Sequence, residues 1–158
     1  QFNYQVWKKR VALTIESARG IVDNKYVDLV KNGMEKLENI ISMMKDQMAG
    51  GKFLQLFVSA TPLQQAMFMM SLAWMHLWSL TITLPKMKQL VGDAKGEERE
   101  KLLADNEEAA YYTGRVLSSQ FYLGSEFPKF FGKADAILFS ETAAIRASDA
   151  VFTGAPLE

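Results

Sequence analysis

The sequence has no cysteine, a single histidine (His76) and no net charge, because 18 lysines and arginines are balanced by 18 aspartates and glutamates. Without cysteine the chain can form no disulfide, thiolate zinc site, iron–sulfur cluster or cysteine nucleophile. A single histidine excludes almost every metal site built from several histidines. Nucleic-acid clamps need an excess of basic residues, which is absent here. The composition of these 158 residues therefore predicts one globular domain that binds no nucleic acid.

The ends of the sequence predict a piece cut from a longer protein. The chain begins at Gln1 rather than at methionine, and no basic stretch followed by a short apolar segment marks a secretory signal. The last two residues, Leu157 and Glu158, resemble a cloning scar before a purification tag. We therefore expect a single helical domain over residues 1–156, excised from a longer chain.

The clearest helical pattern follows Asp23 and Asn24, where apolar residues recur at alternating steps of three and four. This predicted stripe consists of Val27, Val30, Met34, Leu37, Ile41, Met44 and Met48. Gly50 and Gly51 end the pattern. A helix of about 25 residues is roughly 37 Å long, and it can bury such a stripe only against partner helices of similar length. The spacing predicts a helical bundle.

Further helices are predicted on both sides of this one. Residues 2–19 carry a weaker helical pattern. A third helix is predicted over residues 61–84, because Thr61 can cap a helix and Pro62 suits the first helical position. It should end there because Pro85 lacks an N–H donor and disfavours helix in the residue before it.

The third predicted helix is the most apolar part of the chain, and residues 67–84 reach the lower length limit for a membrane span. A helical wheel gathers polar residues within an arc of about 140°. They are Gln64, Gln65, Ser71, His76, Ser79 and Thr83. The opposite side is apolar: Met69, Met70, Ala73, Trp74, Leu77, Leu80 and Leu84. This favours a buried amphipathic core helix without a membrane span, and a membrane-spanning or lipid-facing helix is the alternative.

The C-terminal half predicts a connection and two more helices. Residues 86–101 are charged and contain glycine, with room for a short helix over residues 97–104. Asp105 and Asn106 offer an N-cap for a fourth long helix. That helix should kink or break at Pro128, and a last helix is predicted over about residues 134–148.

Strand patterns are unconvincing throughout, except that residues 53–59 could form a short extended segment. The predicted fold is therefore an all-α, up-and-down bundle of four long helices with one or two short ones.

His76 invites a metal or haem interpretation, but its sequence context argues against both. A di-iron bundle needs Glu-x-x-His pairs on two helices, whereas residue 73 is alanine and no second histidine exists. A haem ligand would lie on the apolar side of its helix, and the wheel places His76 on the polar side. We expect His76 to be a satisfied histidine on a polar or interface position.

Other candidate sites also have simpler interpretations. The glutamates at 97–100 and 107–108 lie among basic residues with little apolar content, so we expect solvated charges rather than a catalytic pair. Gly50 and Gly51 follow a helix and lack the rest of a phosphate loop. The many aromatic residues and nine methionines fit a core, with a ligand pocket or docking face as the alternative. No catalytic, cofactor-binding or metal-binding residue is predicted.

One segment of the fourth predicted helix resembles a known family. Residues 109–122 read Ala-Ala-Tyr-Tyr-Thr-Gly-Arg-Val-Leu-Ser-Ser-Gln-Phe-Tyr, and Phe127-Pro128 follows. This pattern is similar to the C-terminal extension of acyl-CoA dehydrogenases of the 3-methylmercaptopropionyl-CoA dehydrogenase subgroup. Ala60-Thr61-Pro62, which precedes a tryptophan-bearing helix, also resembles that extension. The resemblance covers about residues 25–152.

This resemblance implies a parent flavoprotein that uses FAD to remove hydrogens from the α and β carbons of an acyl-CoA thioester. The family's base is a glutamate in a Tyr-Glu-Gly-Thr segment of a preceding domain, and this chain contains no Tyr-Glu-Gly. No catalytic or FAD-binding residue can therefore be carried over. We expect a non-catalytic, cytoplasmic domain that packs on the catalytic domains of its parent or forms part of a subunit interface, with a homo-oligomer formed through the parent.

Two other interpretations stay open. The first is a free-standing helical module that docks an amphipathic partner helix through a surface rich in methionine and tryptophan. The second is a membrane-associated helical protein built on residues 67–84.

Overall fold

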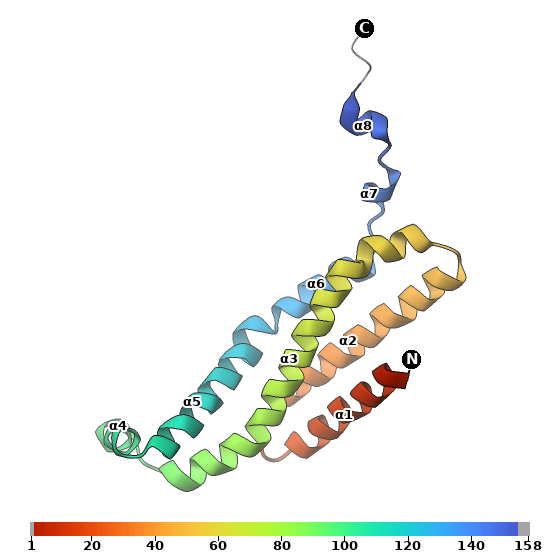
Figure 1. Cartoon of the computed structure of the whole chain (residues 1–158). Helices are drawn as coiled ribbons and strands as arrows, with labels where there is room; N and C mark the ends of the chain where they lie inside the picture. Colours follow the sequence, from red (N-terminus) through yellow and green to blue (C-terminus); the bar gives the residue numbers. More distant parts are fainter. Residues whose placement is uncertain (1, 155–158) are drawn as a thin grey trace.

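A computed structural model describes residues 2–154 and shows an all-α fold. Its elements are α1 (Phe2–Ala18), α2 (Asn24–Ala49), α3 (Phe53–Val91), α4 (Gly96–Asp105), α5 (Glu107–Phe121), the π-helical turn η1 (Tyr122–Glu126), α6 (Lys129–Phe139), α7 (Ala143–Arg146) and α8 (Asp149–Thr153). In Figure 1, α1, α2, α3 and the rod formed in succession by α5, η1 and α6 run alongside one another. The predicted all-α bundle is confirmed, and the described residues contain no strand. Leu157 and Glu158 lie outside the described residues.

The two ends of the bundle differ. At one end α4 turns the chain from α3 into α5, and the side chain of Asn106 accepts a 3.0 Å hydrogen bond from the backbone N–H of Ala109. This confirms the predicted cap and the short helix before it. At the other end α7 and α8 extend beyond the bundle (Figure 1). The predicted last helix over residues 134–148 is wrong: α6 ends at Phe139, and Ser140 takes a left-handed conformation with φ 53°.

A new start after Ser140 explains that break. The carboxylate of Glu141 accepts hydrogen bonds of 2.7 and 2.8 Å from the backbone N–H groups of Thr142 and Ala143. These bonds lower the pKa of the Glu141 carboxyl. A side chain that satisfies the free N–H groups of the next helical turn competes with continuation of the preceding helix.

The core lies where α2, α3 and the α5–η1–α6 rod meet. Its largest fully buried side chains are Phe127, Phe130, Leu37, Ile40, Met70, Leu77, Leu80 and Leu123. Gly33 of α2 allows the closest approach, because a Cβ atom at this position would lie 2.6 Å from Cζ of Phe127. The break predicted at Pro128 is confirmed, because Phe127 and Pro128 form a turn between η1 and α6. Just before it, the N–H of Phe127 bonds to the carbonyl of Tyr122 at 2.8 Å, which closes the π-helical turn η1. This extra residue in the turn delivers the Phe127 ring to the core.

The buried face of α2 follows the predicted stripe only in its first half. Val27, Val30, Met34 and Leu37 are buried as predicted. Further along, the buried residues are Ile40 and Gln47, whereas Ile41 and Met44 are only partly buried and Met48 is 58% exposed. This part of α2 lies against α6, because Lys36 forms an ion pair with Asp135 and Gln47 bonds to Ser140 at the end of α6.

Helix α3 is longer than predicted, since both Pro62 and Pro85 lie inside it. The segment 53–59 is its first two turns, so the extended segment is wrong. Each proline removes one backbone hydrogen bond, but buried residues on both sides of each proline hold the helix through packing. Figure 1 shows α3 bending toward both ends, as expected where a proline interrupts the hydrogen-bond ladder.

Helix α1 is attached to the bundle mainly through α3. The indole N–H of Trp74 donates a 2.8 Å hydrogen bond to Oγ1 of Thr14, and the Trp7 and Trp74 rings meet edge to face at 6.4 Å. An ion pair between Lys8 and Glu38 joins α1 to α2. The predicted first helix is confirmed, although its apolar residue Leu13 faces outward rather than into the core.

Candidate functional site

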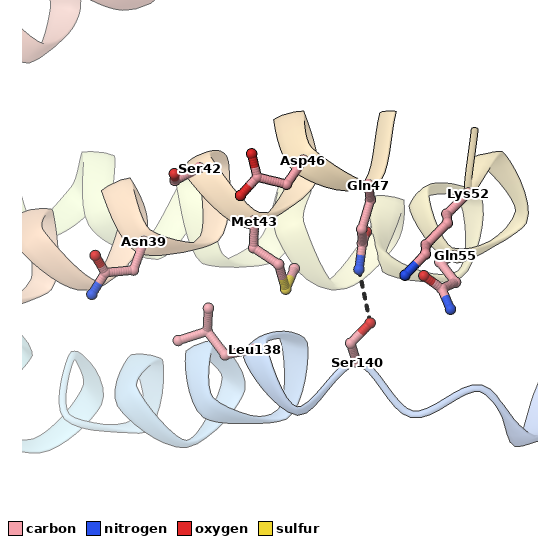
Figure 2. Close-up of a pocket in the computed structure, with 9 residues that line it drawn as sticks. All are labelled: Asn39, Ser42, Met43, Asp46, Gln47, Lys52, Gln55, Leu138 and Ser140. Carbon is pink, nitrogen blue, oxygen red and sulfur yellow. Dashed lines mark hydrogen bonds between the residues drawn. The ribbon is translucent and has the colours of Figure 1, made fainter. Parts of the chain in front are cut away.

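A cleft of about 650 Å³ opens where the C-terminal end of α2, the start of α3 and the end of α6 meet (Figure 2). Its walls are mostly polar. The lining residues are Asn39, Ser42, Met43, Asp46, Gln47, Lys52, Gln55, Leu138 and Ser140. Figure 2 shows Met43 and Leu138 facing each other across the cleft and the Gln47 amide reaching down to Ser140.

Gln47 is the best-fixed residue of this cleft. It is 8% exposed, and its Nε2 atom donates a 2.9 Å hydrogen bond to Oγ of Ser140. The left-handed conformation of Ser140 places that hydroxyl below α2. Oε1 of Gln47 is buried and accepts no hydrogen bond from the described residues. A buried amide oxygen without a donor is costly, so this atom would accept a hydrogen bond from a polar group that enters the cleft.

The cleft offers groups that can bind a polar ligand. Asp46 offers a carboxylate, Lys52 an ammonium group, and the amides and hydroxyls offer neutral hydrogen bonds. Neither histidine nor cysteine lines it, and the hydrogen bond that the structure shows between two of its lining side chains joins the Gln47 amide to the Ser140 hydroxyl.

A second polar arrangement lies in the packed seam between α3 and α5, and it contains His76. Nδ1 of His76 lies 3.2 Å from Oγ of Ser119, and its ring stacks on Tyr122 with 4.6 Å between centroids. Nearby, Arg115 donates a 3.3 Å hydrogen bond to Oγ of Ser79. The prediction of a satisfied interface histidine is confirmed.

Burial decides what this histidine can do. Burial of the ring lowers the pKa of His76 below its ordinary value, and the positive charge of Arg115 lowers this pKa further. The pair of His76 and Ser119 has the composition of a base and a nucleophile, but Ser119 is fully buried in the packed interface. A substrate cannot reach its hydroxyl, so the seam is a structural contact.

The remaining predicted candidates are scattered. The glutamates at 97–100 and 107–108 are exposed on α4 and on the first turn of α5, which confirms that they are solvated. Among residues 2–154, no group of three or more acidic, histidine or cysteine side chains is placed to hold a metal ion. The prediction that the chain has no catalytic, cofactor-binding or metal-binding residue stays a prediction.

Sequence reasoning missed a row of large apolar side chains on the outer face of α3. We call it the α3 stripe: Phe57, Phe68, Met75, Trp78 and Ile82, all exposed. The polar arc of this helix also contains Phe68, Met75 and Ile82, so it is amphipathic in composition rather than uniformly polar. The signal that could have found it is the spacing of Phe68, Met75, Trp78 and Ile82, which is helical and separate from the buried face.

Exposed apolar residues also lie beside the α3 stripe and on other faces. A groove of about 580 Å³ runs between α1 and α3 and is lined by Arg10, Leu13, Thr14, Ser17, Trp74 and Trp78. Leu117 and Phe121 are exposed one turn apart on α5, and Phe139 is exposed on α6. Methionine and aromatic residues therefore supply both the core, as Met70 and Phe127 do, and the surface.

Helix α3 meets the length and composition test for a membrane span, and 28% of its most apolar window is buried. This test is weak by itself, because the core helix of a globular protein can also pass it. The packing of Leu77 and Leu80 inside the bundle shows that one side of α3 serves as such a core helix.

Comparison with known families identifies the family of this domain. The family model described as acetyl-CoA dehydrogenase C-terminal like matches residues 7–148. No curated protein and no solved structure matches the chain.

Proposed function

Because the chain belongs to the acetyl-CoA dehydrogenase C-terminal like family, we propose that it is the non-catalytic C-terminal helical domain of an FAD-dependent acyl-CoA dehydrogenase-like oxidoreductase. The domain is related to an FAD-dependent family. Its role in the parent is to pack on the catalytic domains or to form part of a subunit interface. FAD and the acyl-CoA thioester are bound by those other domains, so that the chemistry takes place outside this chain.

The observation that carries this proposal is the apolar surface left over after the domain has built its own core. Single exposed apolar residues are normal on any protein, but contiguous ones mark interaction surfaces. Phe68, Met75, Trp78 and Ile82 of the α3 stripe recur at helical spacing on one exposed face and form such a surface, as do Leu117 and Phe121 one turn apart on α5. They suit a domain that is covered by other parts of an assembly.

Finer assignments extend the proposal. The pattern at residues 109–122 favours a parent of the 3-methylmercaptopropionyl-CoA dehydrogenase subgroup, which dehydrogenates the α,β bond of an acyl-CoA. We also propose that the parent enzyme is cytoplasmic.

Flavin content and the coding region upstream of Gln1 test the proposal. We expect the purified 158-residue chain to carry no FAD, and the upstream region to encode a Tyr-Glu-Gly-Thr segment in a protein that holds FAD and oxidises an acyl-CoA. Stoichiometric FAD on the chain alone would overturn the non-catalytic role. A reading frame that starts close to Gln1 would overturn the proposal that this domain belongs to a larger parent enzyme.

A free-standing interaction module is the second candidate, and the groove between α1 and α3 favours it. Trp74 and Trp78 could there hold the apolar face of a partner helix. The same upstream sequence separates the two candidates, because a module of this kind would have its own start codon near Gln1.

A further inference from the structure

The α3 stripe has the spacing of a coiled-coil seam. With the smaller residues between its members, the outward face reads Phe57, Thr61, Gln64, Phe68, Ser71, Met75, Trp78 and Ile82. The steps between them alternate between four and three over the whole run. That repeat is the signature of a helix that packs along another helix, yet within residues 2–154 the opposite side of α3 makes the core.

We propose that the α3 stripe pairs with the α3 stripe of a second copy of this chain, with the two helices antiparallel. This pairing names the partner in the subunit-interface role proposed above and rests on that role. The two copies are related by a two-fold axis that crosses α3 at the level of residue 73. At this register the six seam positions from Gln64 to Ile82 meet one another, as an antiparallel pair requires, whereas Phe57 and Thr61 lie N-terminal to Pro62 and outside the paired run.

The register matches side chains of different size. Ser71 faces Met75 of the partner copy next to the axis, Phe68 faces Trp78 in the layers beyond, and Gln64 faces Ile82 further out. A parallel pair would instead put serine on serine and tryptophan on tryptophan, which leaves one layer underfilled and another overfilled. Phe68 with Trp78 is an aromatic pair, and such pairs contribute to association beyond the area that they bury.

Charge also favours an antiparallel second copy. From Phe53 to Pro85 no residue of α3 carries a formal charge with His76 neutral, so two stripes meet without like charges in the seam. Lys86 and Lys88 follow at one end only. The antiparallel pair holds the lysines of the two copies about 40 Å apart at 1.5 Å per residue, whereas a parallel pair stacks them.

The neighbouring helix extends the contact. Leu13 of α1 is exposed and lines the groove that Trp78 shares with α1. Because α1 runs beside the middle of α3, as the bond between Thr14 and Trp74 shows, Leu13 lies near the level of the proposed axis. It would therefore meet the α1 helix of the second copy and widen the apolar interface.

Molar mass in solution tests the pairing on the 158-residue chain. Sedimentation equilibrium should give twice 17.8 kDa for the native chain at micromolar concentration. Phe68→Glu should raise the dissociation constant at least about tenfold, because it places a carboxylate in a desolvated seam. The matched control is Phe121→Glu, since both phenylalanines are 64% exposed and Phe121 lies outside the stripe; it should leave the dissociation constant unchanged.

The register has its own test, because the chain has no native cysteine. Gln64→Cys and Ile82→Cys chains, mixed and oxidised, should form the mixed disulfide. Neither variant should crosslink to itself, because identical positions lie about 27 Å apart in the antiparallel pair, far beyond the about 7 Å that a disulfide spans. Self-crosslinking of each variant without the mixed product would overturn the antiparallel register.

Other occupants of the stripe are outcomes of the same experiments. A monomer at all concentrations, or equal weakening by Phe68→Glu and Phe121→Glu, overturns the pairing. A monomer that floats with neutral phosphatidylcholine vesicles, and loses this binding in Phe68→Glu, assigns the stripe to a lipid surface and also overturns it. Flavin content does not enter these measurements, so failure of the pairing is distinguishable from failure of the proposed parent enzyme.

Discussion

Replacing Gly33 by alanine sets two effects against each other at the tightest contact of the core. Gly33 lies inside α2, where alanine is the better helix former by about 1 kcal/mol. The added methyl group, however, would lie 2.6 Å from Cζ of Phe127 and 3.1 Å from Sδ of Met70. The Phe127 ring cannot move aside easily, because it is fully buried and stacks on Phe130 at 5.2 Å.

The energetic cost of overpacking should be larger than the gain in helix propensity. Inserting a methyl group into a well-packed core costs about 1–3 kcal/mol, which exceeds the gain in helix propensity. Gly33→Ala should therefore lower the free energy of unfolding by up to about 2 kcal/mol. Gly114 supplies the matched control, because it also lies inside a helix and has no atom within 4 Å of an added Cβ. Gly114→Ala should raise the stability by about 0.5–1 kcal/mol.

Thermal and urea unfolding followed by circular dichroism measure both variants. The gap of about 1–3 kcal/mol corresponds to a difference in midpoint of about 2–12 °C for a domain of this size. Phe127→Leu should reduce the cost of Gly33→Ala in a double-mutant cycle, because the shorter side chain frees the contested space. If Gly33→Ala is as stable as Gly114→Ala, the close contact between α2 and η1 is wrong.

Other positions give predictions of known sign. Leu37→Ala should lower the free energy of unfolding by about 2–5 kcal/mol. Ile41→Ala should lower it clearly less, because Ile41 is only partly buried. Equal shifts of the urea midpoint in the two variants would contradict the buried face of α2 described above. The pKa of His76 is lowered by folding, so the unfolded chain binds the proton more tightly and stability should fall as pH drops from about 7.5 to about 5.5. His76→Gln should flatten that part of the stability profile, and an unchanged slope would show that His76 is not buried as described.

Local sequence signals succeeded where one residue determines one backbone feature. Asn106 caps α5 because its side chain reaches the free N–H of Ala109, and no distant contact is needed. The same reasoning failed at Pro62 and Pro85, because proline predicts a helix end only when nothing else holds the helix. Packing of α3 on its neighbours outweighs the lost hydrogen bonds, and this packing is not local.

The candidate sites show a similar division. The interface position of His76 could be predicted because the polar residues of its helix share one arc. The cleft around Gln47 could not, since it depends on a left-handed Ser140 reached 93 residues further along the chain. A hydrogen bond between such distant residues forms only once α2 and α6 have packed together.

The sequence by itself determined the fold class, the capped start of α5, the interface position of His76 and the family, because each depends on local residue order or composition. Only the tertiary structure decided which face of each helix is buried. A helix with apolar residues on two sides, as α3 has, can bury either side. Which side becomes buried depends on which neighbouring helices pack against it in the folded structure. Here Leu77 and Leu80 are buried in the bundle, whereas Phe68 and Trp78 on the other side of α3 stay exposed.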